Sequence, residues 1–352
     1  MYPFRDGSFA VRNGWYVAAF AQDLTTEPMQ RTIVGLPVAL YRKADGTAVA
    51  VGGRCPHRNF PLGKGCVKGD DIVCGYHGIA FGPDGQCTDI PSQDHVPRAY
   101  RIPTFPLVEH GMWLFIWPGD PAKADPTLLP DLEVIGYSSE GMHPAALFSF
   151  EVNGRYQLLN DNLLDLTHLA FLHGTSIGTR ENASTPEELS QEPGIFRSRR
   201  YIRSGPPTPA LARRIGADVR VDQIVGMDFY LPGFHAGIGD HFHASDDPFR
   251  PENLVQKSRV FHAVTPATPT SCYYFFGMAS PNREMIESAR VALEPVLRED
   301  IFATEDIEKM ITLCGGHPTE LMLKSDTGAV TARRMLQTMM DAEAAERASV
   351  AA

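Results

Sequence analysis

The stretch RCPHRNFPLGKGCVKGDDIVCGYHG, residues 54–78, concentrates the chain's candidate metal ligands. It holds half of the chain's 6 cysteines, together with two of its 12 histidines, among glycines and prolines that predict turns. The ligand types occur as two pairs, Cys55-x-His57 and, further on, Cys74-x-x-His77. Because thiolates and imidazoles bind transition metals well, the segment predicts a metal site built from two loops.

The order of the cysteines and histidines indicates which metal this site holds. A zinc finger with the same ligand types groups its cysteines together and places its histidines on a helix. Here cysteine and histidine alternate, and loops with glycine or proline follow each pair, a layout that can clamp a [2Fe–2S] cluster. In Rieske centres two thiolates hold one iron and two imidazoles hold the other. The predicted cluster ligands are Cys55, His57, Cys74 and His77, with a zinc-stabilised binding module as the alternative.

The composition fits a globular protein with more than one domain. A chain of 352 residues, 43% hydrophobic and 21% charged, is long enough for two domains with their own cores. A net charge of -10 argues against a general nucleic-acid binder. The N-terminus has no signal-peptide pattern, and no apolar run has the length of a membrane span. We expect a cytoplasmic protein with reduced thiols and with neither nucleic acid nor membrane as partner.

Turn signals and hydrophobic spacing predict the order of the domains. Short strand-like runs with turns at Asp45-Gly46 and Asp84-Gly85 predict a small all-β domain over residues 1–125. A Pro- and Asp-rich linker then leads to a second domain over residues 126–352. Within it we expect a helix over 156–173, an irregular segment over 176–210, strands within 221–233, 259–266 and 271–279, and helices over 287–313 and 328–348.

A second set of candidate ligands lies in NDNLLDLTHLAFLHG, residues 160–174. On a helix, Asp165 and His168 share a face, and His173, next to the helix-ending Gly174, can turn toward the same point. Two imidazoles and a carboxylate on one side of an iron leave its opposite side open for O2 and a substrate. The alternative is an amphipathic core helix whose histidines are buried and hydrogen-bonded.

The two motifs together resemble the α subunit of Rieske non-haem iron oxygenases, and HAVTPATPTSCYYFFGMA, residues 262–279, is similar to the vanillate and dicamba O-demethylase group. The resemblance implies an α+β chain: an all-β Rieske [2Fe–2S] domain, then a helix-grip catalytic domain of antiparallel sheet with flanking helices. It implies His168 and His173 as ligands of a mononuclear Fe(II), with Asn162 close by. It also implies that Asp165 bridges a ligand histidine to the cluster residue His77 of a neighbouring subunit.

The resemblance places the third iron ligand on a distant helix and also suggests substrate contacts. Among the acids of LREDIFATEDIEKM, residues 297–310, the family pattern selects Asp300, with Asp306 as the fallback. In the same group the histidine before a Thr-Pro step faces the substrate, which here is His262. Phe229, in an apolar run, is a further candidate for an aromatic pocket, with core packing as its alternative.

The activity implied by the resemblance is that of a monooxygenase, the terminal oxygenase component of a multicomponent system. Electrons from NAD(P)H would arrive through a separate flavin/iron–sulfur reductase or a ferredoxin, and the oxygenase would be a homotrimer. Its expected reaction is O-demethylation of a methoxylated aromatic acid with release of formaldehyde. The alternatives are N-demethylation, ring or aliphatic hydroxylation of another substrate, and an electron-transfer protein without oxygenase chemistry.

Overall fold

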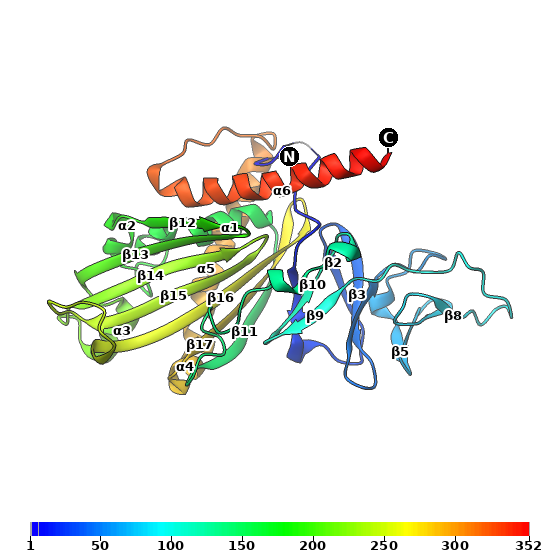
Figure 1. Ribbon diagram of the computed structural model, residues 1–352, viewed down its shortest axis with the longest axis horizontal. Helices are drawn as coiled ribbons and strands as arrows, with labels where there is room; N and C mark the ends of the chain where they lie inside the picture. Colours follow the sequence, from blue (N-terminus) through cyan, green and yellow to red (C-terminus); the bar gives the residue numbers. More distant parts are fainter. Residues whose placement is uncertain (1, 6, 352) are drawn as a thin grey trace. The chain divides into compact units, whose positions relative to one another are not determined.

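The computed structural model describes residues 2–5 and 7–351 of the chain (Figure 1). Ala10–Leu128 and Thr265–Pro269 form one compact unit, and the remaining described residues form the other. The short segment Thr265–Pro269 thus belongs with the N-terminal unit although it lies far downstream in the sequence. The domain boundary after residue 125 remains a prediction. Among the described residues no helix is both long and apolar enough to cross a membrane.

The N-terminal unit contains small antiparallel sheets joined by tight turns. The predicted hairpin turns are confirmed, because Gly46 and Gly85 follow their aspartates with φ of 86° and 76°, a region that favours glycine. The strand orders are β1-β10-β9 (Tyr16–Phe20, Trp113–Ile116, Leu107–His110), β2-β3-β4 (Met29–Ile33, Leu36–Arg42, Ala48–Gly52) and β5-β6-β7-β8 (Cys66–Lys68, Asp71–Val73, Ala80–Phe81, Cys87–Asp89). The unit also contains short 3-10 turns at Ala21–Asp23, Leu62–Lys64, Pro121–Lys123 and Pro126–Leu128.

The core of this unit includes two of the predicted cluster ligands. Cys55 and Cys74 are almost fully buried and pack in one cluster with residues such as Tyr41, Ile72 and Phe81. The cysteine side of both metal-binding loops is therefore held by hydrophobic packing rather than by solvent-exposed contacts.

The other unit is built on a 7-stranded antiparallel sheet with helices, which confirms the predicted α+β architecture. In Figure 1, α4 and α5 lie behind the strands of this sheet. The strand order is β11-β17-β16-β15-β14-β13-β12, with bounds His143–Val152, Ser271–Ser280, Leu254–Thr268, Phe234–His243, Val221–Tyr230, Ile195–Gly205 and Glu188–Glu192. The helices are α1 (Tyr156–Leu164), α2 (Arg180–Ser184), α3 (Pro209–Ile215), α4 (Arg283–Ala292), α5 (Glu294–Leu313) and α6 (Thr327–Ala351), with 3-10 turns η5 (Leu166–Ala170), η6 (Pro251–Asn253) and η7 (Lys324–Asp326).

The prediction of an irregular segment over residues 176–210 is wrong. Strands β12 and β13 occupy much of it, and β13 alternates buried and more exposed residues along most of its length. Two of the buried positions of β13 are Ser198 and Arg200, polar residues that conceal the alternation from a hydrophobicity pattern. Arg200 is accommodated because its guanidinium forms an ion pair with Glu187 at 3.0 Å.

The prediction of one continuous helix to residue 173 is also wrong. Helix α1 ends at Leu164, and Asp165 has non-helical angles of φ -106° and ψ 88°. The Asp165 carboxylate accepts a hydrogen bond from the Thr167 main-chain N–H at 2.9 Å and so caps the 3-10 turn η5. This aspartate stops the first helix and starts a new turn, which changes the direction in which His168 points.

A buried ion pair joins α1 to α5. Arg155 immediately precedes α1, and its Nε and Nη2 atoms donate to the two carboxylate oxygens of Glu308 at 2.6 and 2.7 Å. The main-chain N–H of Arg155 donates to the same carboxylate at 3.1 Å. Burial alone would raise the pKa of Glu308, but the hydrogen bonds and charge of Arg155 outweigh burial and lower it.

Replacement of Glu308 by glutamine should lower the free energy of unfolding by about 3 kcal/mol, because Arg155 is left buried without its counter-charge. Urea denaturation measures this loss. Since the pKa of Glu308 is lowered in the folded state, the stabilisation should be present above about pH 4.3 and disappear as the pH falls through the folded-state value.

Asp306 supplies the matched control on the same helix. Its partner is Lys309, at 2.7 Å, and both side chains are well exposed. Asp306→Asn should change the free energy of unfolding by less than about 1 kcal/mol. Equal losses in the two variants would contradict the role given to the buried pair.

Candidate functional site

The two cluster-binding loops of the N-terminal unit share one hydrogen-bonding plan. The main-chain N–H of each cysteine donates to the carbonyl five residues on, at 2.9 Å for Cys55 and 2.8 Å for Cys74. Each cysteine carbonyl accepts from the N–H four residues on, at 3.0 and 2.9 Å. That fourth residue has a positive φ in both loops, 60° at Asn59 and 74° at Gly78. The loops are therefore structural counterparts, although histidine stands two residues after one cysteine and three after the other.

The ligand types are divided between the inside and the outside of this unit. Cys55 and Cys74 are 1% and 2% exposed, whereas His57 and His77 are both exposed. The two imidazole rings meet edge to face, with centroids 4.6 Å apart. Two buried thiols and two outward imidazoles on opposed loops fit a Rieske cluster, whose thiolates and imidazoles hold different irons.

The second candidate centre brings His168, His173 and Asp300 together; we call these residues the triad. One ligand atom from each residue lies within 4.8 Å of the others. The Nε2 atoms of His168 and His173 lie 3.6 and 2.9 Å from the same carboxylate oxygen of Asp300. Two imidazoles and one carboxylate are the donor set of a mononuclear non-haem Fe(II), so the residues present fit that metal.

The remaining nitrogen of each triad histidine has a partner that fixes its orientation. Nδ1 of His168 donates to the main-chain carbonyl of Asp165 at 2.6 Å. Nδ1 of His173 donates to the carboxylate of Glu299, also at 2.6 Å. Both Nε2 atoms are therefore left to face Asp300. Histidines that bind a metal through one ring nitrogen are commonly oriented by such a hydrogen bond from the other. Sequence reasoning missed this role of Glu299, although its position directly before Asp300 was the available signal.

Electrostatics differ between the two triad histidines. Burial lowers the pKa of His168, with the Asp300 charge only partly opposing it. Burial would lower the pKa of His173 as well, but its hydrogen bonds to Asp300 and Glu299 outweigh burial and raise the pKa. The two carboxylates of the site, those of Asp300 and Glu299, therefore both act on His173.

Two other predicted residues lie close to the triad, and one does not. Asn162 donates from Nδ2 to the triad oxygen of Asp300 at 3.1 Å. The carboxylate of Asp165 accepts from Thr167, and its contact with His168 runs through the main-chain carbonyl rather than through the side chain. Asp306 pairs with Lys309 at the surface, so the structure brings Asp300 and not Asp306 to the histidines.

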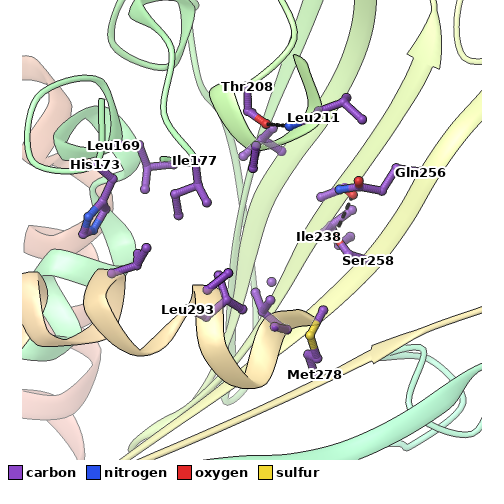
Figure 2. Close-up of a pocket in the computed structure, with 18 of the residues that line it drawn as sticks. Leu169, His173, Ile177, Thr208, Leu211, Ile238, Gln256, Ser258, Met278 and Leu293 are labelled. Atoms are coloured by element: carbon purple, nitrogen blue, oxygen red, sulfur yellow. Dashed lines mark hydrogen bonds between the residues drawn. The ribbon is translucent and has the colours of Figure 1, made fainter. Parts of the chain in front are cut away.

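A cavity of about 510 Å³ opens beside the triad. In Figure 2, His173 lies at one side of it and Gln256 at the opposite side, with Ile177 and Leu293 between them. Its further lining is mainly apolar and includes Leu163, Leu166, Leu169, Leu211, Val225, Met227, Val260, Phe276, Met278, Val296 and Leu297. A volume and lining of this kind suit a small organic ligand.

The two predicted substrate residues have different surroundings. His262 lines the cavity, and its Nδ1 lies 2.6 Å from the Tyr274 hydroxyl. Burial lowers the pKa of His262 to about 4, so the ring is neutral at neutral pH. Phe229 is fully buried and stacks on His235 with ring centroids 4.3 Å apart. It is not among the residues that line the cavity, so the structure gives Phe229 its alternative role in core packing.

Comparison with known families accounts for both centres. Residues 14–106 match the Rieske [2Fe-2S] domain, and residues 152–342 match the vanillate O-demethylase oxygenase C-terminal domain. The chain belongs to the Rieske non-haem iron oxygenases. This oxygenase is 32% identical over 346 residues to the dicamba O-demethylase oxygenase component of Stenotrophomonas maltophilia, covering 95% of this chain and 99% of that protein.

Other relatives agree with this assignment. The oxygenase is 31% identical to a vanillate O-demethylase oxygenase subunit of Pseudomonas sp. (strain HR199 / DSM 7063), covering 97% of this chain and 98% of the relative. Crystalline dicamba monooxygenase bound to 3,6-dichlorosalicylic acid superposes with a TM-score of 0.87 at 31% identity, covering 96% of this chain and 100% of the other.

These matches confirm the predicted family, fold and enzyme class. The chain is a Rieske oxygenase component of a multicomponent system, with a [2Fe–2S] cluster and a mononuclear iron. A zinc-stabilised binding module is wrong, since the match to residues 14–106 is a Rieske domain. An electron-transfer protein without oxygenase chemistry is wrong as well, because an oxygenase domain covers residues 152–342.

Replacement of Asp300 by alanine should remove the mononuclear iron, because the two histidines alone lack the anionic ligand that completes the set. Metal analysis should show less iron at unchanged acid-labile sulfide, and the EPR signal of the reduced cluster should persist. Asp306→Ala is the matched control and should retain all iron. Full iron content in Asp300→Ala would contradict the assignment of this ligand.

Proposed function

We propose that this oxygenase removes the methyl group of a methoxylated aromatic acid as formaldehyde. The observation that carries the proposal is the apolar cavity beside the triad, in a chain whose relatives along nearly its whole length are named for O-demethylation. The proposed ligands are Cys55, His57, Cys74 and His77 for the cluster, and the triad for the mononuclear iron. When bound, these two centres supply the electrons and the activation of O2.

The chain's own residues contribute position and exclusion of water. Leucine, valine and methionine side chains of the cavity can hold an aromatic ring with its methoxy group toward the triad. The Asp165 carbonyl and the Glu299 carboxylate fix the triad histidines, while Asn162 holds the Asp300 carboxylate. His262 is neutral and pairs with Tyr274, so its other ring nitrogen can form a hydrogen bond with the polar group of the substrate.

The reaction balances as a monooxygenation. R–O–CH3, O2, two electrons and two protons give R–O–CH2OH and water, with one C–H bond replaced by C–OH. The hemiacetal then loses its hydroxyl proton, and the bond between the aryl oxygen and the CH2 carbon breaks. The aryl oxygen takes up a proton. The products are formaldehyde and a phenol.

We further propose a cytoplasmic homotrimer in which Asp165 of one subunit meets His77 of the next. Tyr76, next to His77, and Phe171, between the triad histidines in sequence, are 59% and 82% exposed. Large exposed apolar side chains in the two segments that carry the proposed partners are what a subunit contact would cover. Sedimentation velocity tests the oligomeric state, and a monomer at micromolar concentration would contradict it.

A screen of methoxylated benzoic acids with a matching reductase tests the proposed reaction. One formaldehyde should form for each O2 consumed with a productive substrate. The second candidate is hydroxylation of a ring methyl group, because a stretch of 182 residues is 43% identical to a putative toluene-4-sulfonate monooxygenase subunit of Comamonas testosteroni. That reaction would consume O2 and yield an alcohol that keeps the carbon, without formaldehyde.

Asp165→Asn should leave both metal centres intact but lower turnover by at least about a hundredfold, if the carboxylate carries the contact between subunits. Iron content and cluster EPR should match the parent, since the main-chain carbonyl that orients His168 is unchanged. Single-turnover rates after reduction of the cluster measure the effect directly. Undiminished turnover would refute the bridging role.

A further inference from the structure

A row of polar side chains lies at the end of the cavity remote from the triad. Gln223, His241 and Gln256 are direct neighbours across β14, β15 and β16, and all three line the cavity. We call them the distal polar row. Six residues of extended strand separate Gln256 from His262 near the triad, a distance of about 20 Å. Figure 2 shows Gln256 across the cavity from His173.

Two members of the distal polar row are buried with hydrogen-bonding atoms that have no partner in the described part of the chain. His241 is 6% exposed, and neither of its ring nitrogens makes a hydrogen bond of good geometry, although the Gly239 carbonyl lies close enough to the ring to oppose the effect of burial on its pKa. Gln223 is 0% exposed; its Nε2 donates to the Pro206 carbonyl at 2.9 Å, while its Oε1 has no partner. Buried polar atoms without partners destabilise a fold, so their presence on a cavity wall points to a ligand.

The neighbouring groups determine which ligand chemistry fits. Gln256 accepts from Arg214 through Oε1 at 3.0 Å, which leaves its amide nitrogen available as a donor. A carbonyl such as that of Pro206 can only accept, so the free atom of Gln223 is an acceptor. Burial lowers the pKa of His241 to about 4, and a neutral imidazole offers one donor and one acceptor.

The charged groups around the row do not change this assignment. Asp240, beside His241, forms a double hydrogen bond with Arg259 at 2.6 and 3.0 Å. Arg213, Arg214 and Glu284 line the cavity as exposed side chains of both signs, and Arg214 contacts the row through Gln256. A carboxylate at the row would face the acceptor of Gln223, whereas a hydroxyl or carboxamide can donate to one member and accept from another.

The cavity floor between the triad end and the row has space for an extended molecule. Gly237 and Gly239 lie on the central strand β15, between the level of His262 and the level of the distal polar row. They pair with Val260 and Ser258 of β16. A Cβ added at Gly237 would lie 2.5 Å from a Val260 methyl, and one at Gly239 would lie 2.8 Å from the Ser258 hydroxyl. Because these two positions carry no side chain, the cavity floor is lower between the triad and the distal polar row.

We propose that the distal polar row binds an uncharged hydroxyl or carboxamide group at the far end of an elongated, mainly apolar substrate whose other end is oxidised at the triad. The inference rests on the proposed function for the oxidised end. It keeps O-demethylation at the triad but departs from the proposed single-ring acid, because a single ring beside the triad would not reach the row and the row is assigned an uncharged group.

Binding of p-methoxyphenyl alkanols to the iron-loaded oxygenase under anaerobic conditions tests the proposal. The chain is lengthened one carbon at a time, and each alcohol is compared with the matching compound that ends in methyl. At one chain length the alcohol should bind about tenfold tighter than its methyl counterpart, measured by calorimetry. Equal affinities of the alcohol and the methyl-ended compound at every length would overturn the proposal. Tighter binding of the carboxylate than of the alcohol of the same length would contradict the assignment of an uncharged ligand.

Variants in the row separate ligand binding from structure. His241→Leu should abolish the preference for the alcohol but raise the melting temperature of the ligand-free protein, because an unpartnered buried imidazole is removed. His243→Leu is the matched control, since His243 is exposed on the same strand and does not line the cavity. A retained preference in His241→Leu, or a lowered melting temperature, would contradict the assigned role.

Gln223→Met provides a second variant of similar shape, and it should also reduce the preference for the alcohol. If neither variant folds, the comparison of alcohol and methyl probes in the parent protein still decides. The test does not depend on turnover. Failure of O-demethylation would show as absent formaldehyde with binding intact, whereas failure of the row would show as equal binding of the paired probes.

Discussion

One buried carboxylate oxygen organises the catalytic unit. Oδ1 of Asp300 is approached by Nε2 of His173, Nε2 of His168 and Nδ2 of Asn162, at 2.9, 3.6 and 3.1 Å. Asp300 lies on α5, whereas the other groups come from α1 and the turn that follows it. The site therefore exists only if these segments keep a fixed separation, and the buried pair of Arg155 and Glu308 ties them together two helical turns beyond Asp300.

The sequence predicted much of the molecule because metal ligands are chemically distinctive. Cysteine and histidine in alternation indicated the cluster loops, and the spacing from Asp165 to His173 indicated the second centre. The third ligand could be chosen only by family pattern, since Asp300 and Asp306 look alike in sequence. In the structure they differ completely, one buried against two histidines and the other paired with a surface lysine.

What the sequence did not reveal depended on one local hydrogen bond and on tertiary contacts. Asp165 breaks the predicted helix because its carboxylate finds a main-chain N–H two residues on, a local competition that hydrophobic spacing does not register. Strand β13 was hidden by Arg200, whose burial needs Glu187. Glu299 and the distal polar row acquire their roles only through partners, or missing partners, far away in the chain.

The glycines of β15 have an evolutionary consequence. The floor of the cavity lacks side chains at Gly237 and Gly239, between the triad and the distal polar row. Gain of a methyl group at either position would crowd Val260 or Ser258 on the cavity floor without touching the iron ligands or the loops that hold the cluster. A lineage built on this sheet could therefore move between long and short substrates by one-step changes while its electron-transfer and oxygen chemistry stayed the same.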